Sequence, residues 1–189
     1  MIVLLNGPPR SGKDTAARCI VNNVSKNRMP FSEYKMSSPL KKMVREFFCL
    51  TIDEHRFIEE HKDRPLKMLL GKKYRDIQIS LSEEWAKQLF DSSILGQIAV
   101  KNIKGRASNV VISDIGFEEE VVPIRHAFPS RVHLLRITRP DCDFSNDSRD
   151  YIPDSCVGTG RMQVVENKYD DVEIYEAQIL RAMKKWITG

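Results

Sequence analysis

The chain begins with an uninterrupted apolar run at residues 2–5, Ile-Val-Leu-Leu. A run without polar alternation is typical of a short strand buried on both faces, as in a parallel sheet covered by helices. After a glycine-containing stretch, apolar residues recur at helical spacing: Ala16, Ala17, Cys19, Ile20 and Val24. The pattern therefore predicts a strand, a loop and an amphipathic helix.

Later apolar segments predict four more strands, at residues 33–37, 109–113, 131–137 and 162–166. Apolar positions three and four residues apart predict helices at 38–48, 53–61, 75–89, 94–103, 117–128 and 172–186. Pro39 lies in the first turn of its predicted helix, and Pro123 is expected near the start of its own.

This order of strands and helices indicates an α/β fold with a doubly wound parallel sheet, forming one domain over residues 1–189. The core is expected at residues 1–37 and 108–189, with a helical insertion over about 38–107 between the second and third strands. The polar loop at about 139–160 is expected to act as a lid, because so long a connection is unusual in a packed core. In such sheets ligands bind beyond the carboxyl ends of the strands.

The first loop reads Asn-Gly-Pro-Pro-Arg-Ser-Gly-Lys-Asp-Thr at residues 6–15. Its glycines allow the backbone to approach an anion closely, the amides at the start of the following helix favour that anion, and the lysine adds a mobile positive charge. The predicted nucleotide-binding residues are Gly7, Arg10, Ser11, Gly12, Lys13, Asp14 and Thr15, with Lys13 also catalytic. The plainer alternative is an ordinary glycine turn between a strand and a helix.

Two aspartates are candidate magnesium ligands. Asp14 stands where phosphate-binding loops usually have the hydroxyl that holds magnesium, and Thr15 supplies a hydroxyl one residue later. Asp114 ends the strand predicted at residues 109–113, where a carboxylate would lie beside the loop and act in catalysis. The alternative for Asp114 is a cap on the helix that follows it.

Several polar residues elsewhere could bind an anionic substrate. Guanidinium groups match phosphate oxygens with two hydrogen bonds, and the insertion offers such candidates: Lys41, Arg64, Arg75 and Gln78. Arg139 follows a strand on the ligand side and is the candidate to stabilise the transferring phosphoryl group. The alternative for Arg139 and for Arg136 is an ion pair with Asp141 or Asp143.

Composition excludes some classes and leaves one choice open. The apolar runs are too short for a membrane span or a signal peptide, and four scattered cysteines without metal-ligand spacing favour a reduced, cytoplasmic protein. The four histidines also lack metal-ligand spacing. The net charge of +4 and the pI near 8.9 suit either residues gathered to hold phosphates or a polyanionic partner such as DNA.

Segments over most of the chain resemble one family. They are residues 7–15, 38–41, 113–114, 139–140 and 165–167, together with Arg75, Gln78, Phe117 and Glu119. In these segments the chain is similar to the deoxynucleoside monophosphate kinases of bacteriophages, a branch of the adenylate-kinase-like P-loop NTPase fold. The resemblance implies ATP and Mg²⁺ as cofactors, a deoxynucleoside monophosphate as acceptor, Asn167 near the adenine and the host cytoplasm as location. A homodimer is compatible with it.

One position departs from that family. Its members commonly show Asp-x-Arg-Phe, whereas this chain has Asp-Ile-Gly-Phe at residues 114–117. Gly116 thus lacks an arginine expected near the acceptor, and its small size is expected to leave open space beside Asp114. That space suits the alternative function, a phage kinase of hydroxymethyl-deoxyuridine within DNA. A regulatory nucleotide-binding module is the third possibility, although the sequence lacks a guanine-reading or helicase-like motif.

Overall fold

The computed structural model describes residues 1–24, 30–106, 108–145, 147–168 and 171–188. Its contacts divide the chain into two compact units. The first comprises Met1–Met36 and Leu95–Gly189, and the second comprises Ser37–Ile94. The second unit begins where the helical insertion is predicted to begin, and it ends at Ile94, before the expected end of the insertion.

The described residues of the first unit form a parallel sheet in the spatial order β2-β5-β1-β6-β7. The strands are β1 (Ile2–Asn6), β2 (Phe31–Tyr34), β5 (Asn109–Ile112), β6 (Val132–Thr138) and β7 (Met162–Glu166). All five residues of the central strand β1 are buried, as its uninterrupted apolar run predicts. The predicted doubly wound α/β fold is confirmed.

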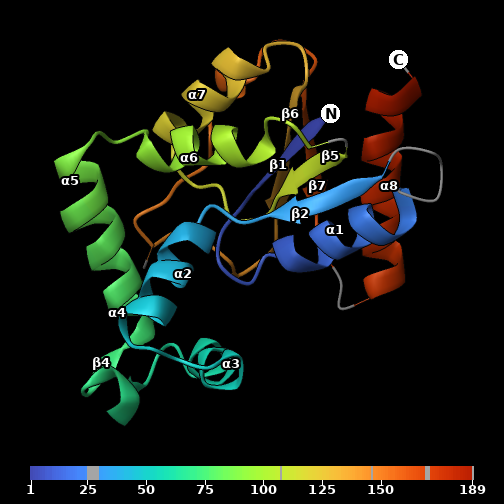
Figure 1. The fold of residues 1–189 in the computed structure, drawn as a ribbon. Helices are drawn as coiled ribbons and strands as arrows, with labels where there is room; N and C mark the ends of the chain where they lie inside the picture. Colours follow the sequence, from blue (N-terminus) through green and yellow to red (C-terminus); the bar gives the residue numbers. More distant parts are fainter. Residues whose placement is uncertain (25–29, 107, 146, 169–170, 189) are drawn as a thin grey trace. The chain divides into compact units, whose positions relative to one another are not determined.

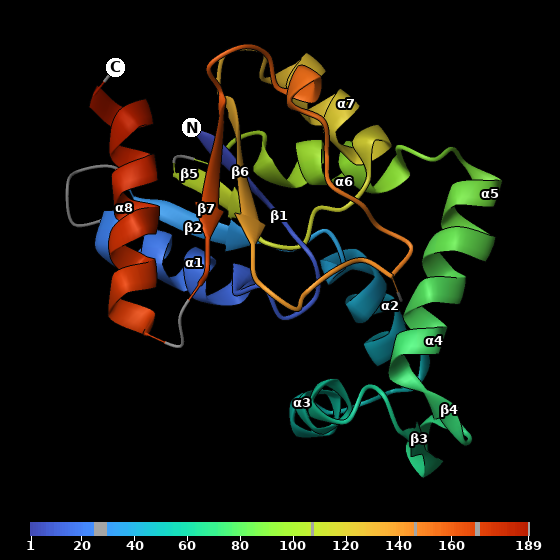
Figure 2. The same ribbon diagram turned by 180° about the vertical axis from the view of Figure 1, so that it is seen from behind.

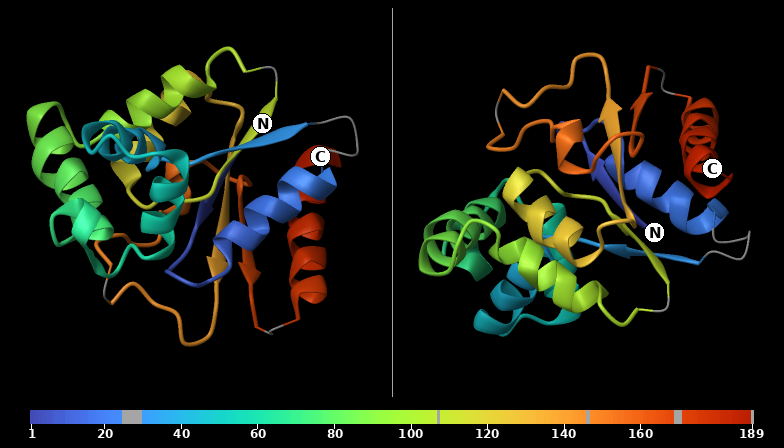
Figure 3. Two further views of the ribbon diagram at one scale, coloured as in Figure 1. Left: turned by 60° about the horizontal axis from the view of Figure 1, so that its bottom comes forward. Right: turned by 90° about the horizontal axis from the view of Figure 1, so that it is seen from above.

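Helices cover both faces of this sheet (Figures 1 and 2). One face carries α1 (Lys13–Cys19), which continues as the π-helical turn η1 (Ile20–Val24), and α8 (Val172–Thr188). The other face carries α6 (Ile94–Ile103) and α7 (Glu118–Ala127). Helices α1 and α8 lie side by side (Figure 3), where the Cys19 thiol donates to the Glu176 carbonyl at 3.8 Å.

The topology selects the end of β1 as the place for a ligand. The connection after β1 leads to β2, beyond β5, whereas the connection after β6 leads to β7 on the opposite side. Connections that diverge from neighbouring strands leave a crevice at their carboxyl ends, and the loop at residues 6–15 begins there.

Several predicted boundaries need correction. Strand β2 begins two residues before the predicted range of 33–37 and ends at Tyr34. Pro123 lies well inside α7 instead of near its start. A Cβ atom on Gly96 would lie 2.3 Å from the Glu120 carbonyl oxygen and 2.7 Å from Cγ of Pro123, so α6 packs closely against α7 at the proline. This close packing helps to offset the helical hydrogen bond that a proline cannot donate.

The second unit is helical apart from a small hairpin. Its elements are α2 (Ser38–Phe47), α3 (Ile52–Glu60), β3 (Pro65–Leu66), the 3₁₀ turn η3 (Lys67–Leu69), β4 (Lys72–Lys73), α4 (Tyr74–Ile79), the π-helical turn η4 (Ser80–Ala86) and α5 (Lys87–Leu89). The buried side chains of Val44, Ile58, Leu69 and Tyr74 form its core. The hairpin of β3 and β4 is not among the predicted strands, and Trp85 and Leu89 are exposed despite their helical spacing. None of the described helices is long and apolar enough to cross a membrane.

A histidine between the sheet and α8 should make stability depend on pH. The ring centroids of His133 and Trp186 lie 4.8 Å apart, and Nδ1 of His133 is buried without a hydrogen-bond partner among the described residues. Burial, followed by the charges of Arg161 and the N-terminal amine, lowers the pKa of His133 from 6.5 to about 4. The unfolded chain therefore binds this proton first, and the folded state loses stability as the pH falls from 6.5 towards 4.

The wild type loses stability as the pH falls from 6.5 towards 4, and we expect His133→Gln to remove about 1 kcal/mol of this loss. The value is modest because solvent screens the charge on a half-buried ring. Urea unfolding of the wild type and the variant at several pH values between 4 and 7 measures it. His126→Gln is the matched control, since His126 is exposed on α7. Parallel pH profiles for the wild type and His133→Gln would contradict the prediction.

Candidate phosphate-binding site

Two glycines let the loop at residues 6–15 take its path. A Cβ atom on Gly7 would lie 2.3 Å from the Ile137 carbonyl oxygen, so the loop leaves β1 in close contact with β6. Gly12 has a φ of +104°, and a Cβ atom there would lie 2.7 Å from Nδ2 of Asn167. The exposed Arg10 also has a positive φ, of 64°. The path of the loop between a buried strand and a helix therefore requires glycine at both positions.

Side chains from the end of β7 and from α8 hold the loop in place. Nδ2 of Asn167 donates to the Ser11 carbonyl at 3.0 Å, and the hydroxyl of Tyr175 donates to the Gly12 carbonyl at 3.1 Å. Ser11 is fully buried, and its Oγ has no hydrogen-bond partner among the described residues. Asn167 therefore shapes the loop directly, while its contact with adenine stays a prediction.

Lys13 lies across its own loop. Its Nζ donates to the carbonyls of Gly7 and Pro8, each at 2.6 Å. Burial, followed by the nearby charge of Arg149, lowers the pKa of Lys13 from 10.5 to about 8, against the opposing effect of Asp14, Asp147 and Asp114. A partly buried ammonium beside a second cation is electrostatically favourable for an anion.

The residues that follow Lys13 meet the end of β2. The Asp14 carboxylate accepts a hydrogen bond from Nζ of Lys35 at 2.7 Å, and the Asp14 side chain is 76% exposed. Oγ1 of Thr15 accepts from Arg18 at 3.4 Å. The sequence reading missed Lys35, which lay inside the strand predicted at residues 33–37, because a lysine is usually a solvated surface residue.

Asp114 is placed at the carboxyl end of β5, and it is not a helix cap. Its Oδ1 accepts a hydrogen bond from the backbone amide of Met36 at 2.6 Å. Helix α7 begins at Glu118, and its N-cap residue is Phe117. The capping alternative for Asp114 is therefore wrong. Next to it, the hydroxyl of Ser113 donates to Glu33.

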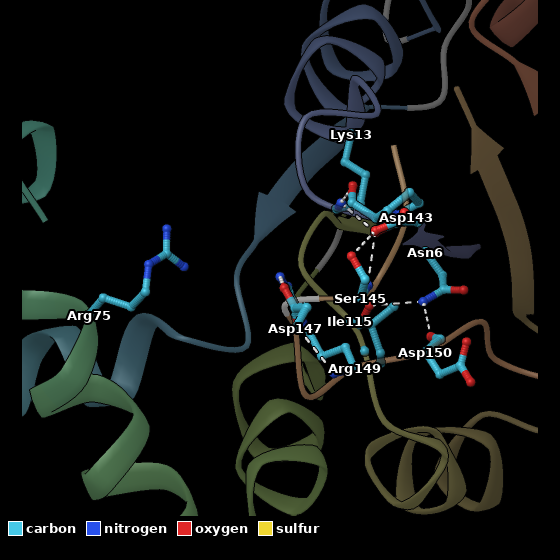
Figure 4. Close-up of polar contacts among 12 residues, drawn as sticks. Asn6, Lys13, Arg75, Ile115, Asp143, Ser145, Asp147, Arg149 and Asp150 are labelled. Carbon is cyan, nitrogen blue, oxygen red and sulfur yellow. Dashed lines mark hydrogen bonds and ion pairs between the residues drawn. The ribbon is translucent and has the colours of Figure 1, made fainter. Parts of the chain in front are cut away.

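Asn6 anchors the second half of the connection between β6 and β7. Its side chain is buried, accepts from the Ile152 amide at 2.9 Å and donates to the Asp150 carbonyl at 3.0 Å (Figure 4). Ile152 and Val157 are each 1% exposed, and the 3₁₀ turn η5 (Asp154–Cys156) lies between them. A lid would therefore have to come from the residues before Asp150; Asn146, in that part, lies outside the described residues.

The two arginines of this region have different surroundings. Arg136 donates to the Ile152 carbonyl at 2.6 Å and lies over the ring of Tyr151, so its role is structural, with a carbonyl in place of the expected aspartate. Arg139 lies near Tyr175: burial raises the pKa of Tyr175, and the charge of Arg139 opposes that rise. Arg139 is thus close to the residue that supports Gly12, and its catalytic role stays a prediction.

Gly116 does not leave open space, contrary to the sequence-based expectation. A Cβ atom on Gly116 would lie 2.1 Å from Cδ, 2.4 Å from Cγ and 2.9 Å from Cβ of Arg149. The side chain of Arg149 therefore lies directly against this glycine, and it forms an ion pair with Asp147 (Figure 4). The sequence reading missed Arg149 because the contact joins segments far apart in the chain.

The predicted substrate-binding residues belong to the second unit. There Lys41 forms an ion pair with Glu59 at 2.7 Å, and Nε of Arg75 donates to Asp63 at 2.5 Å. Arg64 is exposed and Gln78 is half-buried. The first unit brings together the loop, Lys13 and Asp114. Lys41, Arg64, Arg75 and Gln78 remain candidate substrate-binding residues because of the chemistry of their side chains.

The oxygen donors near the loop suit Mg²⁺ better than they suit a metal ion that is held by protein ligands alone. Among the described residues, no group of three or more His, Cys, Asp or Glu side chains could hold a metal ion. Mg²⁺ is usually held by one or two carboxylates, waters and substrate phosphates, so Asp114 with Thr15 or Asp14 fits that pattern. Asp14 would first have to exchange its ion pair with Lys35.

Comparison with known proteins gives a fold-level likeness alone. No protein-family model matches the chain, and no curated protein matches it significantly. Among solved structures, one similar chain is a gluconokinase from Sinorhizobium meliloti 1021, with a TM-score of 0.44, 11% identity, and coverage of 98% of this chain and 95% of that one. At that score the likeness supports no inference about what this chain binds.

Proposed function

We propose that the protein is an ATP-dependent phosphotransferase that moves the γ-phosphoryl group of ATP to a deoxynucleoside monophosphate. The observation that carries this proposal is the loop after β1, where two close-packed glycines precede Lys13, together with Asp114, which lies just beyond the carboxyl end of the neighbouring strand β5. A tight glycine loop at the head of a helix, with a lysine and a nearby strand-end carboxylate, suits a nucleoside triphosphate and its metal.

Each residue has a role that follows from its surroundings. Lys13 exchanges its two carbonyl acceptors for phosphate oxygens, which compensate its partly buried charge far better than neutral dipoles do. Asn167 and Tyr175 keep the loop in shape for this exchange. Asp114 and the phosphates would hold Mg²⁺, which neutralises charge on the transferring group when bound.

The choice of acceptor rests on the second unit and on the resemblance of its segments. Arg75 and Lys41 offer the cationic groups that an acceptor phosphate requires, and both are paired with carboxylates of their own unit. The Arg75–Asp63 pair is exposed, and because exposed ion pairs contribute little stability, a phosphate can replace Asp63 at small cost. The alternative acceptor, hydroxymethyl-deoxyuridine in DNA, loses support because Arg149 fills the space at Gly116.

One experiment separates the acceptors. The protein is incubated with γ-labelled ATP and magnesium, together with each of the common deoxynucleoside monophosphates or with DNA containing hydroxymethyl-deoxyuridine. We expect label on a free nucleotide, with activity that changes little when salt rises from about 50 to 200 mM, because a single small phosphate releases few counterions.

Three outcomes would contradict this expectation. Label on DNA alone, with activity that falls steeply as salt rises, would show that the acceptor is a nucleic acid. Steady hydrolysis of ATP, with no label on any acceptor, would instead indicate a nucleotide-driven regulatory module. ATP binding without either reaction would leave the loop as a nucleotide site and remove the kinase assignment.

A further inference from the structure

We propose that Arg149 is a second phosphate-binding residue of this site, and that Gly116 is a glycine because the Arg149 side chain lies against it. The proposal rests on the proposed function and names the residue that joins Lys13 at the phosphates. The two residues come from separate segments: Arg149 precedes Asp150, whose carbonyl accepts a hydrogen bond from Asn6, and Gly116 follows β5.

The packing explains why residue 116 has no side chain. Its φ lies outside the left-handed region, so the backbone conformation does not demand a glycine. The demand comes from Arg149, whose Cβ, Cγ and Cδ would all lie within 2.9 Å of a Cβ atom at residue 116. Any other amino acid at this position would displace the arginine.

The ion pair with Asp147 directs the guanidinium group. Nε donates to Oδ1 of Asp147 at 2.7 Å, and Nη2 donates to Oδ2 at 2.5 Å. The side chain of Arg149 is 24% exposed and that of Asp147 is 12% exposed, so the pair is largely shielded from water. Nη1 takes no part in this pair, which lets the guanidinium bind a phosphate oxygen while Asp147 still holds it.

The hydrogen bonds of Asn6 place this arginine beside the loop. Nδ2 of Asn6, the residue before Gly7, donates at 3.0 Å to the carbonyl of Asp150, which directly follows Arg149. The same nitrogen donates at 3.4 Å to the carbonyl of Ile115, next to Gly116. The charges agree with this placement, since Arg149 acts on Lys13 and Asp114 acts on Arg149. Two partly buried cations that repel each other are stabilised by an anion, and a guanidinium fork matches a phosphate group geometrically.

The test is a double-mutant cycle on the two contacting residues. Arg149→Gly should lower kcat/KM about 100-fold, the usual effect of losing one charged contact to the transition state. Gly116→Ala should lower it by a similar factor, because its methyl group displaces Arg149. The double variant should be no worse than Arg149→Gly alone, since both changes remove the same contact.

Exchanging the two side chains tests the proposal by recovery of the lost activity. Gly116→Arg combined with Arg149→Gly returns a guanidinium from the opposite side, and it should recover about tenfold of the activity that Arg149→Gly loses. Glycine, not alanine, is needed at residue 149, because even its Cβ would lie 2.9 Å from the new Cβ. Additive losses in the cycle, together with no recovery in the exchanged variant, would overturn the proposal.

A binding measurement keeps the inference separate from the proposed function. Calorimetry with inorganic tripolyphosphate should show affinity about tenfold lower for Arg149→Gly, whether or not the wild type phosphorylates any acceptor. Arg131→Ala is the matched control, since Arg131 is exposed and precedes the opposite, amino-terminal end of β6. Equal affinity for the wild type and Arg149→Gly, in proteins with cooperative thermal unfolding, would overturn the inference alone.

Discussion

Lys13→Ala is expected to lower phosphoryl transfer by about 1,000-fold or more while the protein stays folded. Lys13 is the flexible cation of the loop, and its Nζ is held by the Gly7 and Pro8 carbonyls, which cannot neutralise its charge. Charge that develops on the transferring oxygens would lose its nearest mobile partner. Initial rates with labelled ATP, under the conditions of the acceptor experiment, measure the effect.

The same substitution should not destabilise the protein at neutral pH. Burial, followed by the charge of Arg149, lowers the pKa of Lys13 from 10.5 to about 8. The folded state therefore binds this proton less readily than the unfolded chain, and its charge opposes folding below pH 8. We expect the melting temperature of Lys13→Ala at pH 7 to equal or exceed that of the wild type.

Lys185→Ala is the control for Lys13→Ala, because Lys185 lies on the surface of α8 and donates to Gln163 at 3.0 Å. It should keep wild-type rates. Near-wild-type activity in a folded Lys13→Ala protein would mean that the loop does not bind the transferring phosphates, and the proposed function would fail with it.

Asp114→Asn is expected to lower kcat/KM about 100-fold. The amide oxygen of asparagine can still accept the hydrogen bond from the Met36 amide, so the connection to β2 survives. What disappears is the negative charge that Mg²⁺ requires. Rates measured across magnesium concentrations should show a higher requirement for the metal as well as a lower maximum.

Asp14→Ser is the matched comparison for Asp114→Asn. It restores a hydroxyl where such loops usually carry one, and it removes a carboxylate that is largely exposed and paired with Lys35. We expect it to keep a substantial part of the activity. An Asp114→Asn enzyme that equals the wild type at low magnesium would show that Asp114 has a purely structural part, through its bond to Met36.

The sequence by itself determined the elements whose patterns are local. The run at residues 2–5 is buried as predicted, and both α6 (Ile94–Ile103) and β7 (Met162–Glu166) have the predicted bounds. Continuous apolar runs and three-to-four-residue spacing require no information from distant parts of the chain. The loop at residues 6–15 was identified for the same reason, because its strand, glycines and helix are contiguous.

Tertiary packing decided the features that the sequence left open or placed wrongly. Pro123 lies inside α7 because the absence of a side chain at Gly96 lets α6 approach it. In the sequence, Asp114 is compatible with a cap on the following helix, but α7 begins only at Glu118. In both cases the deciding neighbour belongs to another element, so a local pattern could not distinguish the alternatives.

The candidate site shows the same division most clearly. The sequence by itself determined that Lys13 follows a glycine loop and that a glycine stands at residue 116, two positions after Asp114. Only the tertiary structure decided that the side chain of Arg149 occupies this place and that Asp147 orients it. The physical reason is that Gly116 and Arg149 are joined by steric fit and charge across the fold, and neither leaves a periodic signal in the sequence.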